Sequence, residues 1–542
     1  MTGRHLIFAV PALALGLAAC EGCRSSGGSG SARPPTGGDN EAPTVRLYLL
    51  SDVAGALEPC GCTKDQLGGL DHFGAWVKRE RTHAPAAAIA AAGPLFFMDD
   101  RLDGERADQD RAKADTMARV LRGLGFVAFA PGVNDWADGS VRLADLAGAA
   151  GATAIVAGAD PAPPFAPLVV RDLGGLRVGF IGFGQPAGGD APQGTAASSV
   201  ARGAEEARRQ GANVLVALAA VGRGEAKRIA DAVPELAAVV VGAARSRGEA
   251  NTTAPDAEQV GGVLVVQGAN HLQDAAVLDL YVREPVEPGR LVHFADATGL
   301  ALSHKREDLT RRIDELHVRI AAWERDPSTI PSDLQARKGE LADLERQRDG
   351  LERTPAPAKG SFFRYSLKEM RESLGKDADI EAQMLSYYRA VDEHNRVAFA
   401  DRLPPAPAPD QARYVGMDVC VECHAEAQAV WQKTSHARAY ESLSAQYKEF
   451  NLECVGCHVT GYERTGGSTV THVEKLRNVQ CEVCHGPGSK HAASPLDTSS
   501  LVTNPEPGVC LQCHHPPHVA EFDPAAKRRE ILGPGHGMPL KK

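Results

Sequence analysis

The chain has few aromatic side chains, no excess of positive charge and no long apolar run. Aromatic residues make up 5% of its 542 residues, which is little for a protein whose interior is filled by side chains alone. The formal net charge is −10, so we expect no nucleic-acid partner. With 43% hydrophobic and 24% charged residues the composition is otherwise that of a soluble globular protein. The length predicts about two to four domains.

Residues 1–19 predict a signal peptide, because their apolar run is too short to span a membrane as a helix. The run ends in Leu17-Ala18-Ala19-Cys20, which resembles the lipobox of bacterial lipoproteins and implies that Cys20 carries a lipid. An ordinary signal peptide before an unmodified cysteine is the alternative. Residues 20–43 then form a lipidated, flexible tether rich in glycine, serine and proline. We expect a bacterial cell-envelope lipoprotein that faces the periplasm or the cell surface. The outer membrane is favoured, because Glu21 is not the aspartate that signals inner-membrane retention.

Most cysteines lie near the C-terminus. Eight of the twelve form four Cys-x-x-Cys-His motifs about thirty residues apart, and the others are Cys20, Cys23, Cys60 and Cys62. The motif cysteines are Cys420 and Cys423, Cys454 and Cys457, Cys481 and Cys484, and Cys510 and Cys513. The histidines that follow them are His424, His458, His485 and His514.

This spacing suits covalent haem attachment. Two thiols three residues apart lie on one face of a helical turn, where each can form a thioether to a haem vinyl group. The next residue brings an imidazole to the iron. A zinc half-site or a thiol redox pair could explain one motif, but zinc needs no histidine after every pair. Four motifs in an exported chain therefore predict four covalent haems c, packed close together with little side-chain core.

The second axial ligand of each iron separates an electron carrier from an enzyme. Two imidazoles close the iron, whereas a missing one leaves it open to a small ligand such as nitric oxide. Six histidines from residue 414 onward lie outside the motifs and are candidates for this role: His436, His472, His491, His515, His518 and His536.

Three segments carry a family resemblance: Trp431-x-x-Thr434-Ser435-His436, Gln480-Cys481 to Ser489-x-His491, and Gly535-His536-Gly537. With them, residues 414–542 resemble the tetrahaem cytochrome c family typified by the electron acceptor of hydroxylamine oxidoreductase. The resemblance implies mostly bis-histidine haems, one of them often five-coordinate. It matches His436, His491 and His536 to distal ligands, with His472 next and His515 and His518 in reserve.

Strand-like and helical segments alternate from residue 44 to about 283, which predicts an α/β sandwich. The order of Leu49–Gly55, Gly68–Leu70, Ala92–Pro94 and Leu124–Asp135 resembles the calcineurin-like metallophosphoesterase fold in its 5′-nucleotidase branch.

That family's metal ligands are mostly missing, and only Asp52 and Asn134 remain. A dinuclear site needs about six ligands, including a bridging carboxylate, so we expect no phosphoesterase activity. The replacements are Ala54, Pro94, Asp135 and the histidine-free segments 218–224 and 242–246.

Cys60-Gly61-Cys62 follows the first strand. A thiolate metal site or redox pair and a merely structural role are equally compatible with this spacing, since two sulfurs cannot complete a tetrahedral site. His72 could assist there, but a surface role is favoured.

Residues 301–354 predict a helical hairpin, a coiled coil, because apolar residues recur at helical spacing on both sides of Pro327 and Pro331. A spacer is the favoured role, and a dimer interface is the alternative. Residues 355–413 predict a helix and a proline-rich linker.

The predicted fold is thus multidomain: an α/β metallophosphoesterase-like sandwich over residues 44–300, a helical hairpin, and a mainly α, haem-packed cytochrome c domain over 414–542. The predicted function is electron transfer between redox partner proteins by an exported, lipid-anchored cytochrome whose α/β domain is not catalytic. The alternative is a haem enzyme acting on a small nitrogen or sulfur compound at one five-coordinate haem. A third hypothesis is a binding module whose haems only report the redox state.

Overall fold

The structure is a computed structural model that describes residues 41–59, 66–156, 164–186, 195–246, 250–325, 330–351, 356–515, 518–519 and 522–538. Residues 1–40, with Cys20 and Cys23, lie outside the described residues, as do Cys60 and Cys62. Among the residues described, no helix is both long enough and apolar enough to cross a membrane.

Two β-sheets form the centre of the α/β part. Within the described residues the first sheet has eight strands in the order β13-β14-β12-β1-β2-β3-β4-β5, and the second has six in the order β10-β11-β9-β8-β7-β6. Strands β1 to β5 run parallel, and β12 is antiparallel to both β1 and β14. The first sheet comprises β1 (Val45–Ser51), β2 (Ala87–Ala92), β3 (Phe126–Ala130), β4 (Thr153–Ile155), β5 (Phe165–Ala166), β12 (Asp274–Tyr281), β13 (Ala295–Asp296) and β14 (Phe362–Glu369). The second comprises β6 (Leu168–Leu173), β7 (Leu176–Phe183), β8 (Val214–Ala220), β9 (Ala238–Gly242), β10 (Glu258–Val260) and β11 (Val263–Val266).

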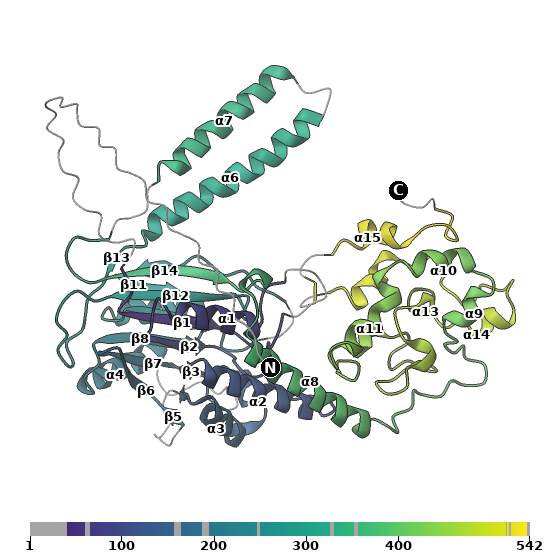
Figure 1. The fold of residues 1–542 in the computed structure, drawn as a ribbon, viewed down its shortest axis with the longest axis horizontal. Helices are drawn as coiled ribbons and strands as arrows, with labels where there is room; N and C mark the ends of the chain where they lie inside the picture. Colours follow the sequence, from purple (N-terminus) through teal and green to yellow (C-terminus); the bar gives the residue numbers. More distant parts are fainter. Residues whose placement is uncertain are drawn as a thin grey trace, which may run out of the picture. The chain divides into compact units, whose positions relative to one another are not determined.

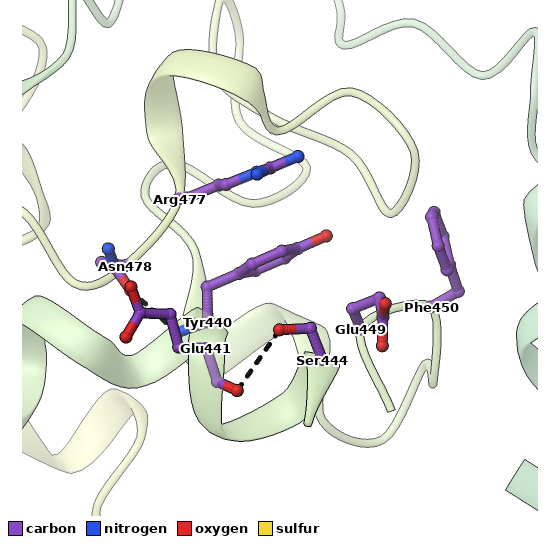
Figure 2. A pocket seen from close by; sticks show the side chains of 7 residues that line it. All are labelled: Tyr440, Glu441, Ser444, Glu449, Phe450, Arg477 and Asn478. Carbon is purple, nitrogen blue, oxygen red and sulfur yellow. Dashed lines mark hydrogen bonds between the residues drawn. The ribbon is translucent and has the colours of Figure 1, made fainter. Parts of the chain in front are cut away.

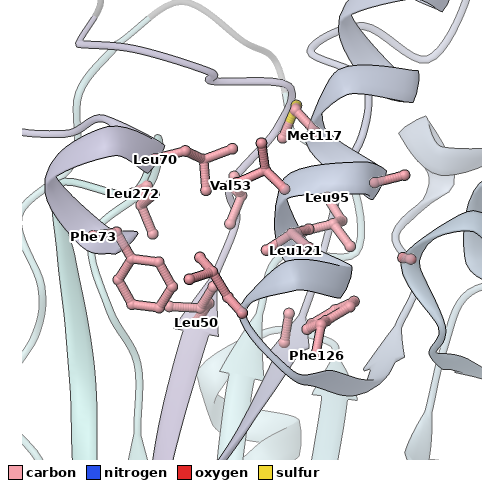
Figure 3. Packing of buried hydrophobic residues seen from close by; sticks show 14 of the residues in the cluster. Leu50, Val53, Leu70, Phe73, Leu95, Met117, Leu121, Phe126 and Leu272 are labelled. Atoms are coloured by element: carbon pink, nitrogen blue, oxygen red, sulfur yellow. The ribbon is translucent and has the colours of Figure 1, made fainter. Parts of the chain in front are cut away.

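The sheets face each other and helices cover their outer sides. Strand β8 is buried along its whole length, as expected for a strand with a layer packed on each face. A first core joins α1 (Leu70–Glu80), α2 (Ala107–Gly123) and α3 (Gly139–Ala150) to the first sheet, with Leu50, Phe73 and Leu121 among its members (Figure 3). Helices α4 (Ala196–Arg209) and α5 (Arg223–Ala232) cover the second sheet. This arrangement confirms the predicted α/β sandwich.

The helical hairpin is inserted into the first sheet. Helices α6 (Leu300–Arg325) and α7 (Pro331–Asp349) lie side by side and pack through Leu309, Ile313, Leu316, Ile320 and Leu344 (Figure 1). In the sequence the two helices come between β13 and β14, which are neighbours in the sheet. Strand β14 also pairs with β12 along its whole length. Helix α8 (Ala378–Ala398) then packs on α1 and α2. The α/β part therefore takes up residues 362–398, which the sequence analysis assigned to the region after the hairpin.

Short helices and turns make up the C-terminal part (Figure 1). They are α9 (Met417–Val421), α10 (Ala425–Trp431), α11 (Ala439–Ser444), α12 (Val455–His458), α13 (Cys481–His485), α14 (Ser489–Ala493), the 3₁₀ turn η6 (Pro507–Gln512) and α15 (Pro524–Ile531). Its hydrophobic cluster is small and centres on Tyr440, Val455, Val459, Val470 and Val473. A part with so little apolar core matches the expected mainly α domain built around cofactors.

Candidate haem sites

Each Cys-x-x-Cys-His motif forms a tight turn. In the first and fourth motifs the histidine N–H donates to the carbonyl of the first cysteine at 2.9 Å, which closes one α-helical turn. The third motif is helical throughout as α13, and the second lies at α12. None of the eight cysteines is in a disulfide. The local fold thus leaves the paired thiols available on one side of a turn that ends at an imidazole.

Three of the four motif histidines face a second histidine from elsewhere in the chain. The ring centres are 6.2 Å apart in each pair. The pairs are His424 with His491, His485 with His536, and His514 with His436. All three residues that the sequence analysis ranked first as distal ligands are in these pairs.

This separation suits one metal held between two imidazoles. A histidine nitrogen binds a transition metal at about 2.0–2.1 Å, so two nitrogens on opposite sides lie about 4 Å apart and the ring centres about 6 Å apart. Direct stacking of the rings would bring the centres closer, as for His514 and Phe522 at 4.2 Å. The paired residues therefore fit a six-coordinate haem iron.

Hydrogen bonds fix the orientation of several of these rings. The Nδ1 of His458 donates to the Ala439 carbonyl at 2.6 Å. The Nδ1 of His485 donates to the Val502 carbonyl at 2.8 Å, and that of His491 to the Asp497 carbonyl at 3.1 Å. A ligand histidine commonly donates its other ring N–H to a carbonyl, which leaves Nε2 for the metal. The observed bonds leave Nε2 available in this way.

Burial favours the neutral form of four of the candidate ligand imidazoles. It lowers the pKa of His436, whose neighbour His514 lowers it further. It also lowers the pKa of His458, His514 and His536. A neutral imidazole is the form that binds a metal, so the site favours the ligand state.

His458 differs from the other motif histidines. Across the described part of the chain, no histidine ring contacts that of His458 at such a separation. His472, expected as the fourth distal ligand, instead has Nδ1 3.1 Å from Thr471 Oγ1 and 3.4 Å from Thr469 Oγ1. His515 and His518 lie against each other, with ring centres 5.4 Å apart. The structure therefore brings six of the eight expected axial histidines together and leaves His458 and His472 apart.

The motifs are close neighbours. The Cys420 thiol is close enough to that of Cys481 for each to shift the pKa of the other, and the same holds for the thiols of Cys457 and Cys513. Cys484 and Cys510 lie within electrostatic reach of each other. The order of neighbouring motifs in space is therefore first, third, fourth, second.

Two polar residues that the sequence analysis did not single out tie motifs together. The Glu482 carboxylate is buried and accepts from Val415 N at 3.0 Å, Gly416 N at 2.8 Å and Gly488 N at 2.7 Å. Gln480 Oε1 accepts from Met417 N at 2.7 Å. Both side chains thus join the third motif to the start of the first. Their only signal in the sequence is a polar pair at the start of the third motif.

A cavity of about 270 Å³ lies beside the second motif but contains none of the motif residues. Figure 2 shows the Arg477 side chain lying over the Tyr440 ring, 5.0 Å from its centre. Tyr440, Glu441, Ser444, Glu449, Phe450, Arg477 and Asn478 line it. Its wall carries two carboxylates and no thiol or imidazole, which does not match covalent haem.

In the α/β part the two remaining metallophosphoesterase-type residues are bonded to backbone. Asp52 Oδ1 accepts from Ala243 N at 2.7 Å, and burial raises the pKa of Asp52 to about 7. Asn134 donates to Met98 O at 2.6 Å and to Ser246 O at 3.1 Å. A side chain at Gly93 would come within 2.0 Å of Asp52 Oδ1. In the described residues no group of three or more metal-binding side chains occurs.

His72 and Asp135 are also buried. His72 Nδ1 donates to Gly375 O at 2.6 Å, so the favoured surface role is wrong for this residue. Asp135 accepts from the backbone N–H groups of Leu95, Phe96 and Gly132, which explains a carboxylate at this position without a metal.

Known proteins resemble the two parts of the chain separately. Residues 419–486 match the family model described as cytochrome c554 and c-prime. Cytochrome c-554 of Nitrosomonas europaea is 36% identical over 93 residues, a match that covers 14% of this chain and 40% of the relative. The chain therefore spans well under half the length of this curated relative.

Solved structures with a likeness to the chain include a 5′-nucleotidase precursor from Thermus thermophilus, with a TM-score of 0.40 and 17% identity over 77% of this chain and 69% of that one. The NAD nucleotidase of Haemophilus influenzae has a TM-score of 0.35 and 15% identity over 44% of this chain and 52% of that one.

The family match begins one residue before Cys420 and ends one residue after His485, so it contains the first three haem-attachment motifs. The expected resemblance of the C-terminal part is confirmed. This part of the chain is similar to the cytochrome c554 family, which supports a multihaem cytochrome with covalently bound haem c.

Proposed function

We propose that this protein is a lipid-anchored electron carrier of the bacterial cell envelope that holds four haems c. The observation that supports it most is the set of three imidazole pairs with ring centres 6.2 Å apart. Each pair joins a motif histidine to a histidine far from it in the sequence. Zinc bound by the cysteine pairs would not require pairs of imidazoles at this separation.

In this proposal the paired imidazoles would be the ligands of three haem irons. His424 and His491 serve the site of Cys420 and Cys423. His485 and His536 serve that of Cys481 and Cys484, and His514 and His436 that of Cys510 and Cys513. His458 would hold the iron at Cys454 and Cys457, where no described histidine ring pairs with it at that separation and His518 lies within electrostatic reach.

When bound, haem c supplies an iron that passes between Fe(III) and Fe(II) by gain or loss of one electron. The chain's own residues attach, orient and enclose it. At three sites the paired imidazoles exclude small molecules, which suits transfer rather than catalysis. The adjacency of the motifs suggests an electron path in the order first, third, fourth, second. One electron enters from a donor protein and one leaves to an acceptor protein.

A second candidate function rests on His458. A site with one axial histidine can bind a small molecule on its other side. A haem enzyme that acts on a small nitrogen or sulfur compound would use this site alone. Electron transfer remains the better proposal, because three of the four sites are closed by a second imidazole.

The α/β part has a non-catalytic role in this proposal. Backbone hydrogen bonds engage Asp52 and Asn134, and a dinuclear metal site needs several more ligands than these two supply. The Cys20 lipid would hold the chain at the membrane, with the outer membrane favoured.

The mass of the denatured protein tests the proposal. Full-length protein made with a haem c maturation system should carry four haems that survive denaturation, because thioethers do not dissociate. The Cys454→Ser/Cys457→Ser variant is the matched control and should carry one haem fewer. Bound zinc in place of haem would refute the proposal.

A further inference from the structure

The chain that precedes the second motif is held by the α/β part. Gln109 of α2 donates to Asn451 Oδ1 at 3.1 Å and accepts from Leu452 N at 3.0 Å. Asn395 of α8 donates to Phe450 O at 2.8 Å. Gln109, Asn395 and Asn451 are all buried, so these bonds are made away from water. The segment that ends at Cys454 is therefore fixed by two helices of the other part.

Two ion pairs of opposite polarity span the same boundary. Lys113 Nζ of α2 lies 2.7 and 2.8 Å from the two carboxylate oxygens of Glu453. Lys448 Nζ lies 2.6 and 2.9 Å from those of Glu58, and 4.4 Å from the centre of the Tyr388 ring. Each part thus contributes one cation and one anion.

The Lys113–Glu453 pair lies next to the haem-attachment residue Cys454. The side chains of Lys113 and Glu453 are 10% and 27% exposed, so water screens their charges only in part. Burial alone would raise the pKa of Glu453, but Lys113 and then Arg106 lower it, so the carboxylate is charged. Burial raises the pKa of the Cys454 thiol, Glu453 raises it further and Lys113 lowers it, so both charges of the pair act at the haem-attachment residue.

The charge of Lys113 also acts on the α/β part. Burial and then Lys113 lower the pKa of His271 to about 4. His271 N donates to the carbonyl of Asp52 at 2.9 Å, at the end of β1. The charge of Lys113 therefore acts both on His271, near the end of β1, and on Glu453, beside the second motif.

We propose that the α/β part sets the reduction potential of the haem at Cys454 and Cys457, and that Lys113 is the positioning residue through which it does so, acting with Glu453. This inference rests on the proposed function, since it requires a haem at the second motif. The α/β part is then a regulatory element of the second haem site.

The sign of the effect follows from charge. The couple is Fe(III) plus one electron giving Fe(II), so a nearby anion favours the ferric form and a nearby cation favours the ferrous form. Lys113→Met removes the cation that acts most strongly on Glu453 and lowers the potential. Glu453→Gln removes the anion of the pair and raises it. The double variant removes both charges and returns the potential towards that of the wild type.

Spectroelectrochemistry of the full-length, haem-loaded protein tests this. One of the four potentials should fall in Lys113→Met by about 59 mV, a tenfold change in a one-electron equilibrium constant. The Cys454→Ser/Cys457→Ser variant lacks that haem and identifies its potential. Arg111→Met is the matched control, because it removes an exposed cation from the same helix, and its four potentials should equal those of the wild type.

Equal potentials in Lys113→Met and Arg111→Met, or a shift spread over all four haems, would overturn the inference. If Lys113→Met does not fold, Glu453→Gln decides: a raised second-site potential supports the inference, and an unchanged one overturns it. Four haems with no shift would leave the proposed function intact, whereas fewer than four haems in the wild type would remove the proposed function itself.

Discussion

His485 and His536 face each other with ring centres 6.2 Å apart and an interplanar angle of 19°. One belongs to a haem-attachment motif, and the other lies in the turn that follows α15. Their separation, like that of the other two pairs, is the one that two imidazoles on a shared metal would have. Ligand pairing is therefore the property of the C-terminal part that mutation can test most directly.

Carbon monoxide should bind one of the four proposed haems in the reduced wild type, the one at Cys454 and Cys457, where no described histidine ring pairs with that of His458. His491→Ala should add a second, because the site of His424 then keeps only its motif histidine. Visible spectra of the reduced protein with and without carbon monoxide count the open sites. His472→Ala is the control and should leave the count at one. Two or more open haems in the wild type would favour the haem-enzyme candidate.

Replacing Glu482 should destabilise the C-terminal part. Its carboxylate accepts from three backbone N–H groups, and an amide in Glu482→Gln has one acceptor oxygen for them. A buried donor left without a partner costs about 1–3 kcal/mol. Urea unfolding followed by haem absorbance measures the loss. Glu422→Gln, which changes an exposed glutamate within the first motif, should unfold like the wild type.

The raised pKa of the Asp52 carboxyl predicts that the free energy of unfolding depends on pH. Its pKa is about 7 in the folded chain and 3.8 in the unfolded one, so between these values the folded state alone keeps the proton. The unfolding free energy should therefore fall as pH rises from about 4 to 7, by at most about 1.4 kcal/mol for each step of one in pH. Asp52→Asn should reduce this slope and be more stable than the wild type at about pH 8, where the wild-type carboxyl has lost its proton. Equal slopes in urea unfolding series at several pH values would contradict this.

Cys20 should determine membrane association. In cells that process lipoproteins, the wild type should sediment with membranes and Cys20→Ala should not, because the acyl chains are lost. Cys23→Ala is the matched control and should remain with the membranes. Fractionation with immunodetection gives the measurement, and equal distribution of wild type and Cys20→Ala would show that no lipid is attached there.

Local sequence patterns were sufficient to predict the haem-attachment motifs, but not the pairing of the ligand histidines or strand β14. The haem motifs could be identified because their chemistry is contained in five consecutive residues. His436, His491 and His536 could be matched from adjacent residues, but their partners could not be assigned, because pairing depends on how the short helices pack. Strand β14 was not anticipated, since its pairing with β12 crosses the whole hairpin insertion.

The residues that join the two parts were also outside the reach of the sequence. Lys113 lies on a charged stretch of an ordinary amphipathic helix, and Glu453 precedes a motif whose own residues account for haem attachment. Neither residue stands out alone. Only the fold brings the ammonium and the carboxylate together.

The contact between Lys113 and Glu453 joins residues 340 positions apart, which has a consequence for biosynthesis. Synthesis and export both proceed from the N-terminus, so α2 and the first sheet strands around it emerge long before the second motif. During that interval the surface around Gln109 and Lys113, buried in the finished chain, faces water without its partner. The nascent α/β part is therefore incomplete until the last quarter of the chain arrives, and a product truncated before residue 447 would keep that surface exposed to aggregation and proteolysis.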